Sequence, residues 1–180
     1  MRIISGKYRG LKLADFEGND VRPTADRVKE SLFNVLYGRI AGACVLDLFC
    51  GSGNLGIECL SRGAETVHFN DISSASLEIL KKNLARLKSP QAFKVTNYDY
   101  SVCLSRADKY DLIFIDPPYR LEIGVDALKL IGAGNLLNEG GLVVFERDRS
   151  FEGEVAGLVK MDERKYGKTY LTFFERAQEA

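Results

Sequence analysis

Short apolar segments alternate with helical segments through the middle of the chain, and this alternation restricts the possible fold more than any other feature. The apolar segments span residues 44–49, 66–71, 92–96, 111–116 and 141–147. The helical segments span about 54–61, 74–87, a short stretch ending near 106, and 123–132. Strands connected by helices form βαβ units, in which the strands run parallel. Strands without polar interruptions also indicate a sheet that helices cover on both faces.

The C-terminal part of the chain departs from this alternation. Segments 158–166 and 168–175 meet at Gly167 with no helix between them, which predicts an antiparallel hairpin at the sheet edge. The expected core is therefore a mostly parallel seven-stranded α/β sheet with an antiparallel C-terminal hairpin. This layout is unusual for a nicotinamide-binding fold and typical of a Rossmann-like class I methyltransferase.

The N-terminal part predicts a small extension of that core. Residues 2–13 are typical of a hairpin that turns around Ser5–Lys7, and Thr24 is a candidate N-cap of a helix that runs to about Tyr37. A length of 180 residues suits one domain. We therefore expect a single domain, with residues 1–40 as the extension and 41–180 as the core.

Composition excludes several classes of protein. Hydrophobic residues make up 46% and charged residues 28%, which is ordinary for a globular protein and excludes a disordered chain. Lys plus Arg and Asp plus Glu both number 25, so any basic surface has to be local. No apolar run is long enough for a transmembrane helix, and Met1–Lys7 lacks the apolar stretch of a secretory signal. These features predict a cytoplasmic protein that does not act at a membrane.

The cysteines and the one histidine do not predict a metal site or a nucleophile. Cys44, Cys50, Cys59 and Cys103 form no Cys-x-x-Cys pair, and His68 is the only histidine. Structural zinc sites need closely spaced Cys and His ligands, so we expect no bound metal. We interpret the cysteines as buried, reduced thiols.

A glycine-rich turn joins the first strand to the following helix. Gly51, Gly53 and Gly56 match the pattern G-x-G-x-x-G, which allows a tight turn and a close approach of the backbone to a ligand. Asp71 ends the second strand 20 residues after Gly51, where a carboxylate can accept the hydroxyls of a ribose. The combination predicts a nucleoside cofactor, and the alternative is a turn that serves packing only.

Asp47 distinguishes between nucleoside cofactors. It lies at the end of the first strand, four residues before Gly51. A carboxylate there would attract the amino group of S-adenosylmethionine and repel the pyrophosphate of NAD. Asp47 therefore favours S-adenosylmethionine, although it could also serve the turn or the helix dipole.

Asp116–Tyr119, with the sequence Asp-Pro-Pro-Tyr, closes the fourth strand. The prolines Pro117 and Pro118 fix the backbone and leave carbonyl acceptors without N–H donors. Together with the Asp116 carboxylate, these carbonyls can accept the hydrogens of an exocyclic amino group. Tyr119 offers a flat ring on which a base can stack. The segment therefore predicts methylation of a base amino nitrogen, and the alternative is a turn with an exposed aromatic ring.

The motifs together resemble a known family. Asp116–Tyr119 resembles motif IV of methyltransferases that modify the amino nitrogens of adenine, cytosine or guanine, and Asp47–Gly53 resembles their motif I. The segments that resemble one family in particular are residues 2–6, 22–27, 30–34, 53–58 and 60–63. That family is the bacterial RsmD-type 16S rRNA (guanine-N2)-methyltransferases, and the similarity extends over essentially the whole chain.

The resemblance implies a role for each matching residue. It implies that S-adenosylmethionine is held by Asp47, Phe49, Cys50, Gly51, Ser52, Gly53, Asp71, Ile72, Asp99 and Tyr100. It places the target guanine of 16S rRNA, free or in the assembling small subunit, at Asp116–Tyr119, and Arg22, Thr24 and Arg27 near the cofactor and the RNA. Asn54, Asn70 and Ser73 depart from the family pattern, which puts the detailed cofactor contacts in question.

A cluster of basic residues near the N-terminus offers phosphate contacts. Arg2, Lys7, Arg9 and Lys12 precede the first acidic residue, Asp15. Tyr8 lies among them and could stack on a base. The alternative is a solvated hairpin. The basic residues of the C-terminal hairpin, at 164, 165 and 168, are interpreted as ordinary surface.

Three other functions stay open on sequence grounds. A DNA or RNA adenine-N6 methyltransferase would use Asp116–Tyr119 in the same way, but the chain has no segment for a separate DNA-recognition domain. A nicotinamide-dependent oxidoreductase would explain Gly51–Gly56 and Asp71 and would leave Asp116–Tyr119 unexplained. A non-catalytic RNA-binding module would not need its full set of acidic residues.

Overall fold

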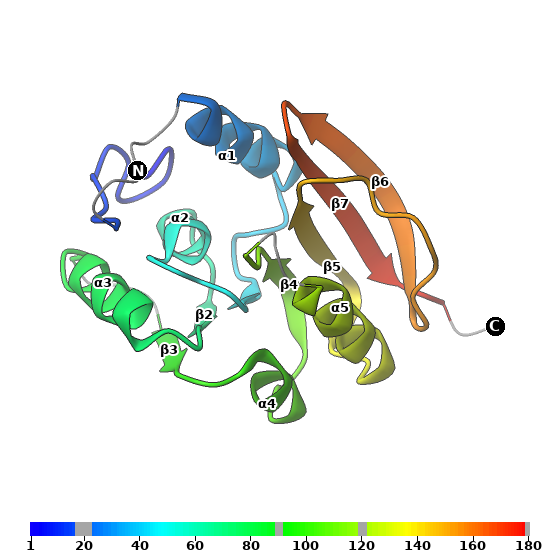
Figure 1. Cartoon of the computed structure of the whole chain (residues 1–180). Helices are drawn as coiled ribbons and strands as arrows, with labels where there is room; N and C mark the ends of the chain where they lie inside the picture. The colour runs from blue at the N-terminus through cyan, green and yellow to red at the C-terminus, as the bar shows by residue number, and fades with distance from the viewer. Residues whose placement is uncertain (17–22, 89–91, 119–121, 179–180) are drawn as a thin grey trace.

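The computed structural model describes residues 1–16, 23–88, 92–118 and 122–178. One seven-stranded sheet forms its centre, with strand order β3-β2-β1-β4-β5-β7-β6. The strands are β1 (Cys44–Asp47), β2 (Thr66–Asn70), β3 (Ala92–Thr96), β4 (Tyr110–Ile115), β5 (Leu137–Arg147), β6 (Leu158–Tyr166) and β7 (Thr169–Arg176). The first five are parallel and β7 is antiparallel to both its neighbours, so the predicted fold class is confirmed (Figure 1).

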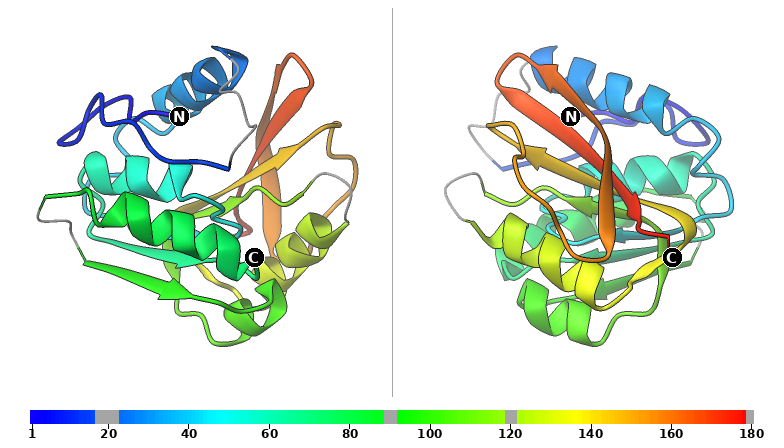
Figure 2. Two further views of the ribbon diagram at one scale, coloured as in Figure 1. Left: turned by 60° about the vertical axis from the view of Figure 1, so that its left-hand side comes forward. Right: turned by 90° about the vertical axis from the view of Figure 1, so that its right-hand side faces the viewer.

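Helices cover both faces of the sheet. They are α1 (Pro23–Val35), α2 (Asn54–Ser61), α3 (Ser74–Leu84), α4 (Tyr100–Ser105) and α5 (Ile123–Ala133). Side chains of α1, α2 and α3 share one apolar core with alternate strand residues such as Phe114, and α4 and α5 share the other with residues such as Ile115. Figure 2 shows the C-terminal hairpin beside α1 at one edge of the molecule. Within the described ranges, the helices are too short or too polar to cross a membrane.

Strand β5 begins four residues earlier than the apolar pattern predicts. Leu137 already pairs with Tyr110, and the register then shifts before Leu142 pairs with Leu112. Gly140 has φ 70°, and a Cβ on Gly141 would lie 2.9 Å from the Asn138 carbonyl oxygen. The glycine pair therefore forms an irregularity inside the strand and does not precede it, which is why the sequence pattern misplaced the boundary.

The predicted N-terminal hairpin forms only in part. One antiparallel bridge joins Arg2 and Lys12, and the turn is wider than predicted, spanning Ser5–Gly10. The segment instead packs on the core, with Ile3 and Leu13 buried. Ile3 still forms backbone hydrogen bonds with Leu11 and Gly10. The amides of Ile4, Ser5 and Tyr8 bond instead to side chains of α2, so residues 2–13 do not form a regular two-stranded ribbon.

A buried carboxylate, Glu58 on α2, provides much of that attachment. Its oxygens accept the amides of Ile4 at 2.9 Å and Ser5 at 3.0 Å. They also accept Lys29 Nζ at 2.9 Å and Arg62 Nε at 2.8 Å. Glu58 and Lys29 are 0% and 4% exposed. The N-terminal segment, α1 and α2 are therefore held at one buried ionic centre, which the sequence pattern did not predict.

Candidate active site

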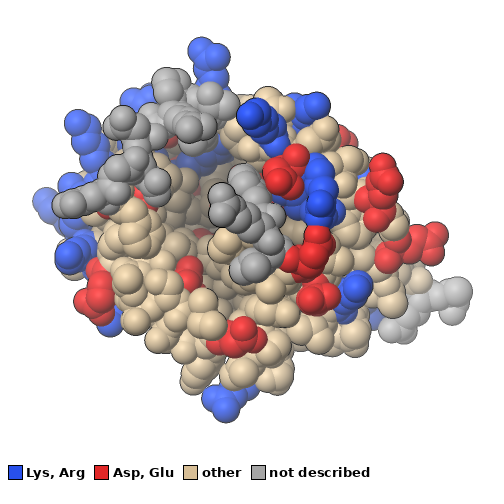
Figure 3. Space-filling view, viewed as in Figure 1, with Lys and Arg blue, Asp and Glu red and all other residues tan. Residues whose placement is uncertain are grey.

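The carboxyl ends of the parallel strands surround a cavity of about 1200 Å³. Its walls come from the loops after β1, β2, β3 and β4, the end of β5, the tip of the β6–β7 hairpin, and residues of the N-terminal segment and α1. The space-filling view shows this face hollowed at its centre, with Lys and Arg side chains gathered toward the N-terminal segment and α1 (Figure 3). A ligand site at the carboxyl ends of parallel strands is the general rule for α/β sheets.

The glycine turn has the geometry that only glycine accepts easily. Gly51 and Gly53 have φ 53° and 87°, and a Cβ on Gly53 would lie 2.3 Å from Leu80 Cδ1. Cys50 donates its amide to the Asn70 carbonyl at 2.9 Å, so the turn is fixed to the end of β2. Phe49, Cys50, Gly51 and Ser52 line the cavity, whereas Gly53 does not line it and is the N-cap of α2.

Asp71 is oriented by two backbone amides. Its Oδ2 accepts the Gly51 amide at 2.9 Å, and its Oδ1 accepts the Ser73 amide at 2.8 Å. Each oxygen retains a lone pair for a further donor. Asp71 faces the cavity next to the glycine turn, which is the placement that the sequence predicted.

Asp47 lies deeper in the cavity and is 2% exposed. Its Oδ2 accepts the Gly56 amide at 2.9 Å. Burial raises the pKa of Asp47 to about 7, and the charge of Asp71 acts in the same direction against the Gly56 hydrogen bond. A cationic ligand would lower the pKa again, so this carboxyl suits a ligand with a positive group.

The residues predicted to contact the adenine come from the segments that follow β2 and β3. Ile72 is 69% exposed and lines the cavity, as do Asp99 and Tyr100. Asp99 caps α4 by accepting the Ser101 amide at 2.9 Å, so its position is fixed. The rings of Phe49 and Tyr100 lie 5.9 Å apart and add a further apolar surface to this side.

Asp116 and the following prolines enter the cavity from the end of β4. Burial raises the pKa of Asp116 well above its usual value, and the charges of Glu146 and Asp47 add to this effect. Pro117 is buried and Pro118 is exposed. Tyr119, the predicted stacking residue, lies outside the described residues.

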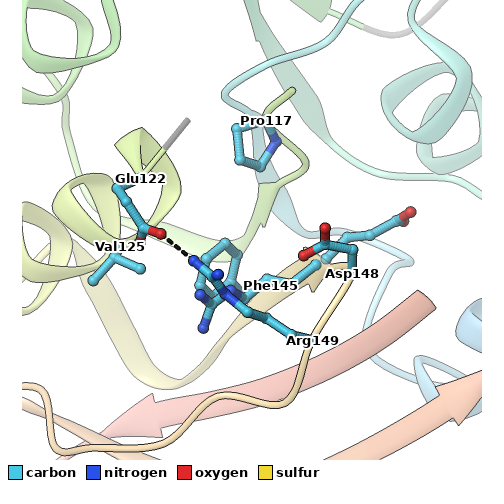
Figure 4. A pocket seen from close by; sticks show the side chains of 8 residues that line it. Pro117, Glu122, Val125, Phe145, Asp148 and Arg149 are labelled. Atoms are coloured by element: carbon cyan, nitrogen blue, oxygen red, sulfur yellow. Dashed lines mark hydrogen bonds and ion pairs between the residues drawn. The ribbon is translucent and has the colours of Figure 1, made fainter. Parts of the chain in front are cut away.

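The far side of Pro117 packs closely on α5. A Cβ on Gly124 would lie 2.8 Å from Pro117 Cγ, so glycine permits this approach. A much smaller cavity of about 20 Å³ lies there, where Arg149 pairs with Glu122 (Figure 4). The backbone at Pro117 is therefore supported from behind, which favours a fixed carbonyl direction.

The two departures at Asn54 and Asn70 have structural explanations. Asn54 Oδ1 accepts the buried Lys29 ammonium at 2.8 Å. Asn70 Nδ2 donates to the carbonyls of Leu48 at 3.2 Å and Tyr98 at 3.1 Å, and so joins the loops after β1 and β3. Both amides therefore shape the cavity wall. The third departure, Ser73, is the N-cap of α3.

A series of buried hydrogen bonds inside the sheet holds the Asn70 side chain in place. Its Oδ1 accepts Thr96 Oγ1 at 2.8 Å, and Thr96 Oγ1 lies 2.8 Å from His68 Nε2. His68 Nδ1 lies 2.7 Å from Tyr110 Oη. Burial and the charge of Lys94 lower the pKa of His68 to about 4, so this histidine is neutral at physiological pH. His68 thus has a supporting role inside the sheet.

The predicted RNA contacts lie outside this cavity. Arg2, Lys7, Arg9, Lys12 and Arg27 are exposed on the N-terminal segment and α1. Arg22 and the side chain of Thr24 lie outside what the structure describes. Tyr8 is held against the core, and its hydroxyl donates to the Lys88 carbonyl at 2.7 Å, so its stacking role finds no support here.

Several cavity residues were not predicted as site residues. They include Lys29 with Asn54, Glu146 at the end of β5, the hairpin tip Tyr166–Thr169, and Met1, Asp15, Phe16 and Leu32 of the N-terminal segment and α1. The tip includes Lys168, which the sequence had assigned to ordinary surface. Glu146 could have been predicted from its position, because the carboxyl end of β5 borders that of β4 in this topology.

Of the cysteines, Cys50, Cys59 and Cys103 are buried and Cys44 is half-buried, and all four are free thiols. Cys44 is less buried than predicted because it lies at the outer end of β1. In the parts of the chain that the structure describes, no three His, Cys, Asp or Glu side chains form a cluster that could hold a metal ion.

Comparison with known proteins places the chain among methyltransferases. The family model described as Conserved hypothetical protein 95 matches residues 1–175. The putative rRNA methyltransferase YlbH of Bacillus subtilis is 38% identical, over 98% of this chain and 99% of its own. Ribosomal RNA small subunit methyltransferase D of Haemophilus influenzae is 38% identical, over 83% and 79%. The structure of a putative methyltransferase, yhhF, from Escherichia coli superposes with a TM-score of 0.87 at 34% identity, over 98% and 97%.

Proposed function

Since the chain belongs to the Conserved hypothetical protein 95 family, which includes ribosomal RNA small subunit methyltransferase D, we propose that it methylates the exocyclic N2 of a guanine in 16S rRNA. The observation that carries the proposal is the opening of Asp116–Pro118 into the same cavity as Asp47 and Asp71. One cavity can therefore hold a methyl donor and an amino group together. We place this activity in the cytoplasm, on free rRNA or on the assembling small subunit.

The cavity fits S-adenosylmethionine as the methyl donor. Asp47 matches the amino group, Asp71 the ribose hydroxyls, and the exposed Ile72 an adenine face. When bound, this donor supplies an electrophilic methyl group on a sulfonium, which departs as a neutral thioether once an amino nitrogen has taken the methyl. The buried Asp47 carboxylate would attract the cationic amino group and repel the pyrophosphate of NAD, so it favours S-adenosylmethionine.

The chain's own residues would orient and activate the amino nitrogen. The Asp116 carboxylate and the Pro117 carbonyl accept its two hydrogens, which directs its lone pair toward the methyl group. Burial raises the pKa of Asp116, and once the carboxyl has lost its proton its negative charge also stabilises the positive charge that develops on this nitrogen. Asp116 is a suitable acceptor for the proton released afterwards, with water as the alternative.

The target base has to leave its helix to enter the cavity. The cavity lies at the carboxyl ends of the parallel strands, whereas the exposed basic residues lie on the N-terminal segment beside it. Phosphate contacts there would hold the RNA while a single nucleotide is extruded. Transfer of a labelled methyl group to small-subunit rRNA, followed by analysis of the digested nucleosides, tests the proposal.

Binding of the methyl donor should depend on pH through Asp47. We expect the affinity for S-adenosylmethionine to fall about tenfold for each pH unit below 7, because the carboxyl must first lose its proton. Above about pH 8 the donor's own α-amino group becomes neutral, so affinity should be greatest between these values. Calorimetry from pH 5.5 to 8.5 measures this, with Asp47→Asn as control. An equally steep pH dependence in Asp47→Asn would contradict the assignment.

The basic residues of the N-terminal segment should act on RNA affinity alone. Removal of residues 1–13 is unsuitable as a test, because Ile3 and Leu13 are part of the core. We expect the Arg9→Gln/Lys12→Gln variant to reduce the slope of log affinity against log salt by roughly 1.4–1.8, the value for two lost phosphate contacts. Filter binding measures the slope.

The matched control for this experiment is Lys109→Gln/Lys129→Gln. These two exposed lysines belong to the α4–α5 side of the sheet, and their replacement removes the same charge. Affinity for S-adenosylhomocysteine should be unchanged in both double variants. Equal slopes in the two variants would show that the N-terminal residues do not contact phosphate.

A further inference from the structure

A second carboxylate, Glu146, lies next to Asp116 at the carboxyl ends of β4 and β5. Ile115 of β4 pairs with Phe145 of β5 in parallel register. Asp116 directly follows β4, and Glu146 is the next residue of β5. Neighbouring strands lie about 4.8 Å apart. The two carboxyl groups therefore start from adjacent positions at the end of the sheet.

Both side chains belong to the same face of the sheet. Phe114 and Val144, two residues earlier on each strand, pack in the core that α1, α2 and α3 cover. Because side chains alternate along a strand, Asp116 and Glu146 are directed to that face as well. Glu146 lines the large cavity, and its charge contributes to the raised pKa of Asp116.

The proposed transfer leaves Glu146 without a role. The two hydrogens of an exocyclic amine are accepted by Asp116 and by the Pro117 carbonyl. A further carboxylate beside them offers only acceptor atoms. Its partner on a base would be a donor that neighbours the amino group.

Among the bases with an amino group, only guanine has such a donor. Its N1–H adjoins the N2 amine on the Watson–Crick edge, whereas adenine N1 and cytosine N3 present lone pairs next to their amines. A carboxylate at Glu146 would therefore attract guanine and repel adenine and cytosine.

We infer that Glu146 is the residue that specifies guanine, with its carboxylate accepting N1–H while Asp116 and Pro117 hold N2. This inference rests on the proposed function and adds the means by which the base is recognised. Asp116 alone would accept any base amine. The pair of adjacent carboxylates matches the adjacent donors of guanine, and a site built around a hydrogen bond rejects an analogue that lacks it.

The experiment compares guanine with 2-aminopurine, which keeps the N2 amine but lacks the O6 carbonyl and has a lone pair at N1. The nucleotide that the wild-type protein methylates in small-subunit rRNA is first mapped. Ligated rRNA that carries 2-aminopurine riboside at that position is then the second substrate. Single-turnover methyl transfer is measured on both RNAs for the wild type, Glu146→Gln and Glu139→Gln. Glu139 is an exposed glutamate near the other end of β5 and receives the same substitution.

We expect the wild type and Glu139→Gln to methylate guanine about 10- to 150-fold faster than 2-aminopurine, the effect of one hydrogen bond to a charged acceptor. Glu146→Gln should be slower on guanine and should bring the ratio near one, because its amide can donate to the N1 lone pair. A substitution at Asp116, which contacts the N2 amine of both bases, would instead slow methylation of guanine and of 2-aminopurine to the same extent. An unchanged ratio in Glu146→Gln, or equal wild-type rates on the two RNAs, would overturn the inference. If the wild type forms no N2-methylguanosine, the proposed function itself fails.

Discussion

Replacement of Asp116 by alanine should lower kcat about 100- to 1000-fold, the usual effect of losing one group that stabilises developing charge. The carboxylate orients the amino nitrogen and opposes the positive charge that forms on it. Because this interaction strengthens in the transition state, kcat should fall more than KM rises. Affinity for S-adenosylhomocysteine should change little, since Asp47 and Asp71 are the polar groups assigned to the cofactor.

Asp116→Asn distinguishes orientation from charge. Its amide oxygen still accepts one hydrogen bond but carries no negative charge, so its rate should lie between those of the wild type and Asp116→Ala. Single-turnover transfer with saturating cofactor measures all three proteins. A wild-type rate in Asp116→Ala would mean that transfer to an amino nitrogen does not depend on this carboxylate.

Replacement of Glu58 by alanine should destabilise the protein by about 3–5 kcal/mol, because it leaves the Lys29 ammonium buried without its carboxylate. The amides of Ile4 and Ser5 lose their acceptor in the same variant. Loss of these two hydrogen bonds should release the N-terminal segment from α2. Urea denaturation measures the free energy of unfolding, and hydrogen exchange at Ile4 and Ser5 follows the segment itself.

Lys29→Met is the matched variant for this ionic centre. It removes the ammonium and leaves Glu58 with Arg62 and the two backbone amides. We therefore expect Lys29→Met to lower the free energy of unfolding less than Glu58→Ala does. The expected loss is about 1–3 kcal/mol, because Asn54 Oδ1 and the Arg2 carbonyl no longer accept a hydrogen bond from Lys29. A larger cost for Lys29→Met than for Glu58→Ala would contradict this account of the N-terminal attachment.

The sequence located several helices and strands with the limits that the structure shows. α2, β3 and β6 have the predicted limits. Glycines border two of them, with Gly53 before α2 and Gly157 and Gly167 on either side of β6, so these limits can be recognised locally. The location of the cavity could also be predicted from the sequence, because the carboxyl ends of parallel strands lie together at one end of the sheet.

The parts that sequence reasoning missed depend on partners far apart in the chain. Glu58 bonds to residues more than fifty positions away, at Ile4 and Ser5, and nothing near Glu58 indicates those contacts. Glu146 gains its place only when β5 is set beside β4. The irregular start of β5 arises from a glycine pair that resembles an ordinary turn in the sequence.

The most direct test of the central claim is the identity of the methylated nucleoside. Purified protein, labelled S-adenosylmethionine and either free 16S rRNA or small subunits that lack the modification are incubated, and the RNA is digested to nucleosides. A DNA duplex serves as the parallel substrate. The account predicts that the label appears in N2-methylguanosine from the RNA and not in the DNA. Label in N6-methyladenosine, or transfer to the DNA in preference to the RNA, would contradict it.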